Sequence, residues 1–108
     1  MSEGKFPPWY THIKEKHGSI IEALENLGEA VRQAGPLPEK TVQLIQLAAA
    51  AANRSEGAVH SHVRRALQAG ATPDEIYHAI LLLTSTIGFP TVSAALSWAY
   101  EGIEQKKA

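Results

Sequence analysis

Residues 62–76 read HVRRALQAGATPDEI, a stretch that predicts the end of one helix and the start of the next. Gly70 can adopt the left-handed backbone conformation that commonly follows the last turn of a helix. Thr72, Pro73 and Glu75 then have the order of a helix start: a threonine cap, a proline in the first turn, and a glutamate that can complete a capping box. We therefore expect two consecutive helices joined by a short loop.

Hydrophobic residues at helical spacing extend this pattern in both directions along the chain. Helix-breaking residues interrupt it at Gly35–Pro36, Asn53–Arg54 and Gly88–Phe89–Pro90. The pattern predicts helices at about 19–34, 38–52, 56–69, 72–83 and 91–104. Ser55 is expected to cap the third of these. Because no segment alternates with a period of two, we expect an all-α fold of five to six helices that associates by helix packing.

The N-terminal part of the chain has a different pattern. Residues 1–10 include two prolines, and we expect an extended arm there. Ser19 and Glu22 have the spacing of a capping box, which predicts the start of the first core helix. The chain length suits one domain. We assign residues 1–108 to it, with 1–18 as the arm and first turns and 19–105 as the helical core.

Composition excludes several classes of function. The 108 residues carry a formal net charge of −1, so no basic field exists to hold nucleic acid or an anionic membrane surface. The longest apolar run, residues 47–52, is far too short to span a bilayer, and the first residues lack a signal-peptide core. We expect a cytoplasmic protein. The absence of cysteine excludes disulfides, thiolate ligands and cysteine nucleophiles in this chain.

Several short motifs occur together between residues 43 and 95. They are Leu44–Ala48 (LIQLA), His62, Ala66–Thr72 (ALQAGAT), Asp74–Ile76 (DEI) and Gly88–Pro90 (GFP). In this combination they resemble the carboxymuconolactone decarboxylase and alkylhydroperoxidase D superfamily. The resemblance implies an all-α subunit that forms a homo-oligomer, commonly a trimer or a hexamer, with a pocket among the helices or between subunits.

The chain departs from the peroxidase branch of that superfamily. In that branch a Cys-x-x-Cys pair stands at the start of the histidine-bearing helix, and a glutamate stands on the preceding helix. The corresponding residues here are Ser55, Ala58 and Gln43. Thiol-based peroxide reduction needs a nucleophilic and a resolving thiol, so we do not expect peroxidase activity.

The chain also departs from the decarboxylase branch. There the Glu-Ile pair is followed by a second glutamate, and a histidine and a tyrosine precede the Gly-x-Pro motif. The corresponding residues here are His78, Leu82 and Thr86. The chain therefore matches the scaffold of the superfamily and neither of its two sets of site residues.

His62 is the first candidate for catalysis. It lies on the same helical stripe as Ser55 and Ala58, which lines the pocket in members of the superfamily. Histidine titrates near neutral pH and can act as a general acid or base. His78, in the place of a family carboxylate, is the second candidate. The alternative for His62 is a core histidine that is hydrogen-bonded to a helix carbonyl or to Gln43.

Four further residues are candidates for substrate binding: Gln43, Ser55, His60 and Arg65. The guanidinium group of Arg65 could bind the carboxylate of an acidic substrate, although a solvated charge or an interface salt bridge is the alternative. Ser55 suits a helix cap better than a nucleophile, because its hydroxyl would bond the backbone. His60, by itself, also suits a partly exposed surface position.

A histidine-ligated metal is a weaker hypothesis. His60, His62 and His78 could in principle form a three-nitrogen zinc site. The first two are only two residues apart on one helix and point to different faces, and no local metal motif supports the set. We therefore assign no metal ligand and expect no cofactor.

Two hypotheses of function remain. The first is a cofactor-free, non-redox enzyme of the decarboxylase or lyase type, in which His62, with His78, transfers protons on a small organic acid. The second is a non-catalytic oligomeric protein that binds a small molecule on the same scaffold.

Overall fold

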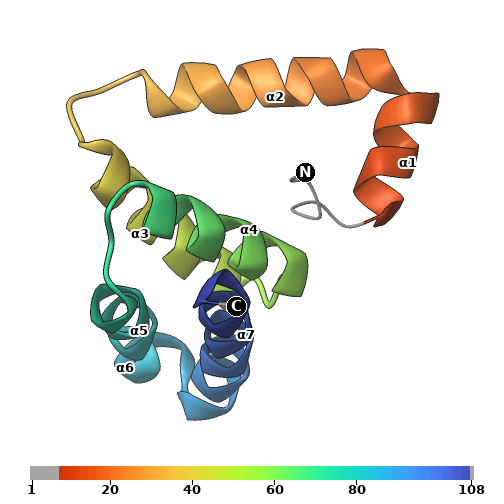
Figure 1. Ribbon diagram of the computed structural model, residues 1–108. Coiled ribbons are helices and arrows are strands. Elements are labelled where there is room, and N and C mark those ends of the chain that lie inside the picture. The colour runs from red at the N-terminus through yellow and green to blue at the C-terminus, as the bar shows by residue number, and fades with distance from the viewer. Residues whose placement is uncertain (1–7, 108) are drawn as a thin grey trace. The chain divides into compact units, whose positions relative to one another are not determined.

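The computed structural model describes residues 8–107, with side chains as far as Gln105. Within this part of the chain the regular elements are the seven helices labelled in Figure 1, so the prediction of an all-α fold is confirmed. None of these helices is long and apolar enough to cross a lipid bilayer. The chain divides into two compact units, Met1–Leu37 and Pro38–Ala108.

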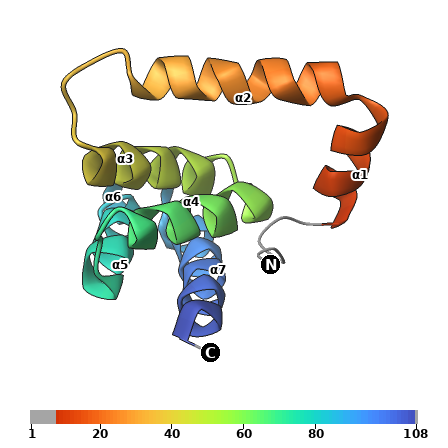
Figure 2. The ribbon, with the colours of Figure 1, turned by 45° about the horizontal axis from the view of Figure 1, so that its top comes forward.

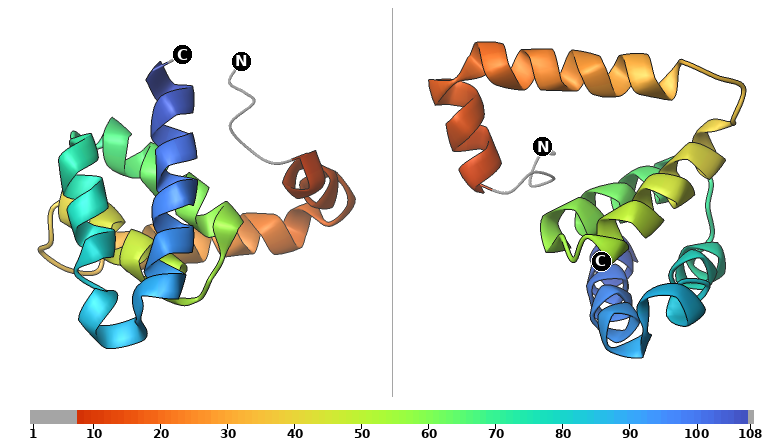
Figure 3. Two further views of the ribbon diagram at one scale, coloured as in Figure 1. Left: turned by 90° about the horizontal axis from the view of Figure 1, so that it is seen from below. Right: turned by 180° about the vertical axis from the view of Figure 1, so that it is seen from behind.

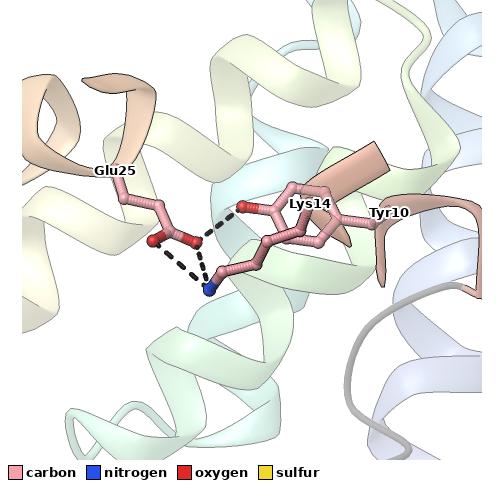
Figure 4. Close-up of polar contacts among 3 residues, drawn as sticks. All are labelled: Tyr10, Lys14 and Glu25. Carbon is pink, nitrogen blue, oxygen red and sulfur yellow. Dashed lines mark hydrogen bonds and ion pairs between the residues drawn. The ribbon is translucent and has the colours of Figure 1, made fainter. Parts of the chain in front are cut away.

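The first unit contains α1 (Pro8–Lys16) and α2 (Gly18–Arg32), which pack against each other. The hydroxyl of Tyr10 donates a hydrogen bond to Oε2 of Glu25 at 2.9 Å, and Nζ of Lys14 lies 3.2 Å from the same oxygen. Figure 4 shows both side chains of α1 converging on this carboxylate. All three groups are accessible to water, so they contribute little to stability and mainly orient the two helices.

Two predictions for this region are wrong. Residues 8–10 do not form an extended arm, because Pro8 begins α1, a position where the missing amide hydrogen costs no helical bond. The rest of the predicted arm, residues 1–7, lies outside the described residues. Ser19 does not cap α2, because the helix begins one residue before it. The residue before the first turn is His17, whose side chain makes no capping hydrogen bond.

The second unit contains the remaining helices. They are α3 (Glu39–Ala52), α4 (Glu56–Gln68), α5 (Pro73–Leu81), α6 (Thr84–Ile87) and α7 (Phe89–Lys107). Figure 2 shows α3 and α4 side by side, and α7 packs against both α4 and α5 (Figure 3). The facing sides enclose the core, whose largest fully buried apolar side chains are Leu47, Val59, Val63, Ile76, Ile80 and Val92.

The local signals at the ends of α4 and α5 are confirmed. Oγ of Ser55 accepts a hydrogen bond from the backbone amide of Ala58 at 3.4 Å. Thr72 and Glu75 make both bonds of the capping box: Oγ1 of Thr72 accepts from the amide of Glu75 at 3.1 Å, and Oε1 of Glu75 accepts from the amide of Thr72 at 2.9 Å. Gly70 has a φ of +96°, in the region that favours glycine.

The break between α5 and α7 differs from the prediction. The helix expected over 72–83 ends at Leu81, and the short helix α6 follows it. The hydroxyl of Thr84 donates to the carbonyl oxygen of Leu81 at 2.8 Å, which satisfies one of the terminal carbonyls. The last helix begins at Phe89 and not at Thr91, because Pro90 is tolerated in its first turn.

Candidate functional site

Helices α3 and α4 bring Gln43 and His62 together. Gln43 is the most deeply buried polar residue among those described, with 1% of its surface exposed. Its Oε1 atom lies 2.8 Å from Nδ1 of His62, and its Nε2 atom donates to Oε2 of Glu39 at 2.7 Å. The three side chains therefore form one hydrogen-bonded row from a carboxylate through an amide to an imidazole. We call this row the Glu39–Gln43–His62 row.

The row determines which nitrogen of His62 carries a proton. A carboxylate only accepts hydrogen bonds, so the amide nitrogen of Gln43 must face Glu39. The amide oxygen then faces His62 and can only accept, so Nδ1 of His62 is the donor. In the neutral ring Nε2 is consequently the basic nitrogen. This bond to Gln43 is the one expected of a core histidine, the alternative given above for His62, and the same bond orients the ring as a general acid or base needs.

Glu39 was not among the predicted site residues. It lies in the first turn of α3, where a negative charge is favoured by the helix dipole, and four residues before Gln43, on the same face of the helix. That spacing could have identified Glu39 as a partner of Gln43. It does so only once position 43 is known to face the core, because an exposed glutamate in the first turn of a helix is common.

Ser55 serves as the cap of α4. Its hydroxyl is half-buried and accepts from the amide of Ala58, as the preference for a capping role over a nucleophilic one predicted. A hydroxyl that accepts this bond can still donate its own hydrogen, so substrate binding by Ser55 stays a prediction.

His60 belongs to a different surface of α4 from His62. Its Nε2 atom lies 3.2 Å from Oε1 of Glu101 on α7, whereas His62 bonds to α3. The two histidines thus point toward different helices, as their spacing of two residues requires. The structure does not bring His60 to the Glu39–Gln43–His62 row.

Residues 19–101 match the model of the carboxymuconolactone decarboxylase family. The chain belongs to this family. The match runs from α2 through most of α7 and includes Gln43 and His62. Comparisons with curated proteins and with solved structures gave no significant match.

In this carboxymuconolactone decarboxylase family member, His78 lies on the exposed side of α5. Ile76 and Ile80, two residues before and after it, are fully buried. A separation of two residues places side chains on nearly opposite faces of a helix, so His78 points away from the core. Cooperation between His78 and His62 stays a prediction.

Two arginines follow His62 on α4. Arg64 and Arg65 are both half-buried. Partial burial, and then the neighbouring charge of Arg65, lower the pKa of the Arg64 guanidinium, which is still charged at neutral pH. A partly desolvated pair of positive charges favours an anionic neighbour. The assignment of Arg65 to a substrate carboxylate is consistent with this electrostatic setting and stays a prediction.

One buried hydrogen-bond acceptor lies close to Gln43 on α3. Oε1 of Gln46, three residues further along α3, is buried and has no hydrogen-bond partner among the described residues. A buried acceptor without a donor costs about 1–3 kcal/mol. In native proteins a buried acceptor usually has a hydrogen-bond donor, which water or a bound molecule can supply.

Proposed function

We propose that this family member is a non-redox enzyme of the lyase type, in which His62 transfers a proton on a small organic acid. The observation that carries the proposal is the Glu39–Gln43–His62 row. A buried amide holds the ring through Nδ1, and we assign the proton transfer to the other ring nitrogen, Nε2. Positioned imidazoles of this kind contribute about 10²–10⁴-fold to the rate of proton-transfer reactions.

The family name supplies the substrate class, a carboxylated lactone. In its decarboxylation the bond between the carboxylate carbon and the ring carbon breaks and carbon dioxide leaves. The electron pair of that bond passes into the conjugated lactone carbonyl as an enolate. The imidazolium form of His62 delivers one proton from Nε2 to carbon and recovers it from solvent. Substrate carboxylate and one proton thus give product and carbon dioxide.

Arg65 is assigned to the second carboxylate of such a substrate. The guanidinium group offers paired donors that match the two oxygens of a carboxylate. Thiol peroxidase chemistry is excluded for this chain, because it contains no cysteine to form the thiolate nucleophile.

A homo-oligomer, as a trimer or hexamer, is part of the proposal. The support for it is a row of apolar side chains on one face of α2. Each side chain of this row is more than half exposed: Ile20, Leu24, Leu27 and Val31. They follow the i, i+4, i+7, i+11 spacing of a single helix stripe. Contiguous apolar surface of this kind marks an interaction face, and a second copy of the chain is the occupant we propose.

Carboxymuconolactone is the probe that tests the reaction. Release of carbon dioxide and the proton spectrum of the product are to be compared between the wild-type chain, His62→Ala and His62→Gln. The matched control is His12→Ala, which removes an exposed histidine of α1. Circular dichroism checks that each variant is folded.

We expect turnover by the wild-type chain and by His12→Ala, and a loss of about 10²–10⁴-fold in both His62 variants. Equal rates in wild type and His62→Ala would overturn the role of His62. Tight binding of the probe without any release of carbon dioxide would contradict the proposed enzymatic activity and favour a non-catalytic binding protein. If the chain neither binds nor converts the probe, the proposed substrate class is wrong.

A further inference from the structure

A second group of side chains with metal-ligating atoms lies away from the Glu39–Gln43–His62 row. It consists of Glu56 and His60 of α4 and Glu101 of α7. One ligand atom from each of the three lies within 4.8 Å of the other two. The shortest separation, 3.2 Å, joins Nε2 of His60 to Oε1 of Glu101. We call these three residues the α4–α7 cluster.

The helices hold this cluster in place. Glu56 and His60 are four residues apart, so they project from the same face of α4. Glu101 reaches them from α7, which packs against α4. A Cβ atom built on Gly102 would lie 3.1 Å from Cγ1 of Val63, which is fully buried. The glycine therefore permits the close approach that sets the distance between Glu101 and His60.

The separations suit one bound cation. Zinc binds nitrogen and carboxylate oxygen at about 2.0–2.2 Å, and tetrahedral angles then place the ligand atoms about 3.4 Å apart. The observed 3.2 Å between His60 and Glu101 already matches that spacing. Glu56 lies within 4.8 Å, so a modest side-chain rotation completes the set.

The charges of the α4–α7 cluster also favour a bound cation. Two carboxylates meet at one imidazole, and their mutual repulsion is relieved by a divalent cation. His60 alone can neutralise only one of them, and only in its protonated form. About one third of the His60 side chain is exposed, so water has access to a fourth position, as it has in zinc sites with three protein ligands.

We propose that the α4–α7 cluster binds a divalent transition-metal cation, of which zinc is the probe. A ligand set with an imidazole favours such ions over magnesium and calcium, which prefer oxygen alone. The bound ion joins α4 to α7 and stabilises the fold of the second unit. The site is distinct from His62, so its existence does not depend on the reaction proposed above.

Calorimetric titration of the full chain with zinc chloride tests the site, after chelator treatment and dialysis. The variants are Glu56→Gln, His60→Gln and Glu101→Gln. The matched controls are Glu22→Gln and His12→Ala, which remove exposed groups of the same types in the first unit. The melting temperature of each protein, with and without zinc, is the second readout.

We expect one zinc ion per wild-type chain and a higher melting temperature with zinc. Loss of His60 is expected to weaken binding by about 100-fold, loss of either carboxylate by about 10-fold or more, and the controls are expected to bind as wild type does. Absence of zinc binding by the wild-type chain would overturn the proposal. Unchanged affinity in His60→Gln, or an equal loss in His12→Ala, would overturn it as well.

Discussion

Nδ1 of His62 lies 2.8 Å from Oε1 of Gln43, although the two residues are 19 positions apart and on different helices. The resemblance to the peroxidase branch implies a glutamate at the position of Gln43. Here the carboxylate is Glu39, one helical turn earlier, and the amide stands between it and the imidazole. An amide accepts and donates hydrogen bonds but does not readily carry a proton, so Gln43 positions the ring.

Gln43→Ala is expected to lower the free energy of unfolding by about 1–3 kcal/mol, because it removes a fully buried side chain together with its hydrogen bonds to Glu39 and His62. Urea denaturation followed by circular dichroism measures this difference. The control is Gln33→Ala, whose side chain bonds Glu29 on the exposed surface of the first unit. It is expected to change stability by no more than about 0.5 kcal/mol. Equal effects of the two substitutions would contradict a structural role for Gln43.

Gly102→Ala is expected to destabilise the protein, although alanine favours a helix by about 1 kcal/mol relative to glycine. The added Cβ would lie 3.1 Å from the side chain of Val63, which is fully buried and has little freedom to move. Overpacking of this kind costs about 1–3 kcal/mol. Thermal unfolding of Gly102→Ala and of Gly57→Ala provides the comparison.

Gly57 lies on α4 with open space around it, so Gly57→Ala is expected to be neutral or stabilising. Val63→Ala in the background of Gly102→Ala should cost less than Val63→Ala alone, because the clash is then removed. A rise in melting temperature for Gly102→Ala equal to that for Gly57→Ala would refute the close helix crossing.

The two confirmed caps should differ in their contribution to stability. Ser55→Ala and Thr72→Ala are each expected to cost about 1 kcal/mol. The larger loss is expected at Thr72, where the bond to the amide is 3.1 Å against 3.4 Å at Ser55 and where Glu75 completes the box. Denaturant titration measures both. Ser93→Ala, an exposed serine within α7, is the control and should change stability by less than about 0.5 kcal/mol.

The stability that Glu75 contributes should depend on pH. The hydrogen bond from the backbone of Thr72, and then that from Lys40, lower the pKa of Glu75 below its ordinary value of 4.5. A lowered pKa in the folded state contributes stability above the unfolded value and loses it as the pH falls through the folded value. The difference in unfolding free energy between wild type and Glu75→Gln should therefore be greatest above about pH 4.5 and diminish below it.

Lys40→Met tests the cause of that dependence. Nζ of Lys40 lies 3.2 Å from Oε2 of Glu75, so its removal should reduce the pH dependence without abolishing it. The same measurement, chemical denaturation from pH 3 to pH 7, serves both variants. A pH dependence that Lys40→Met leaves unchanged would assign the whole effect to the backbone of Thr72.

The helical part of the fold was largely predictable because its signals are local. The capping box at Thr72, the cap at Ser55 and the left-handed Gly70 depend on residues within one turn of each other. The errors arose where two local signals competed. At Ser19 the capping pattern was present, but α2 begins before it, directly after α1. Helix α5 ends at Leu81, inside an apolar run that periodicity alone would continue as helix, and the hydroxyl of Thr84 bonds the carbonyl oxygen of Leu81.

The candidate site was predictable only in part. His62 and Gln43 were identified from the resemblance to the family, and their hydrogen bond is the one that the alternative of a core histidine predicted. The place of His78 on the outer face of α5 and the involvement of Glu39 depend on which side of each helix meets the core. That orientation follows from packing between helices and is weakly encoded in any one of them.

The sequence by itself determined the all-α class, the principal helix boundaries, the family and the absence of thiol chemistry, because each follows from short-range patterns or from composition. Only the tertiary structure decided that Glu39 supports Gln43 and His62, and that Glu101 meets Glu56 and His60. The second set joins residues more than 40 positions apart, across a helix crossing that Gly102 makes close. Contacts at that separation depend on how whole helices pack, and no local pattern of residues specifies them.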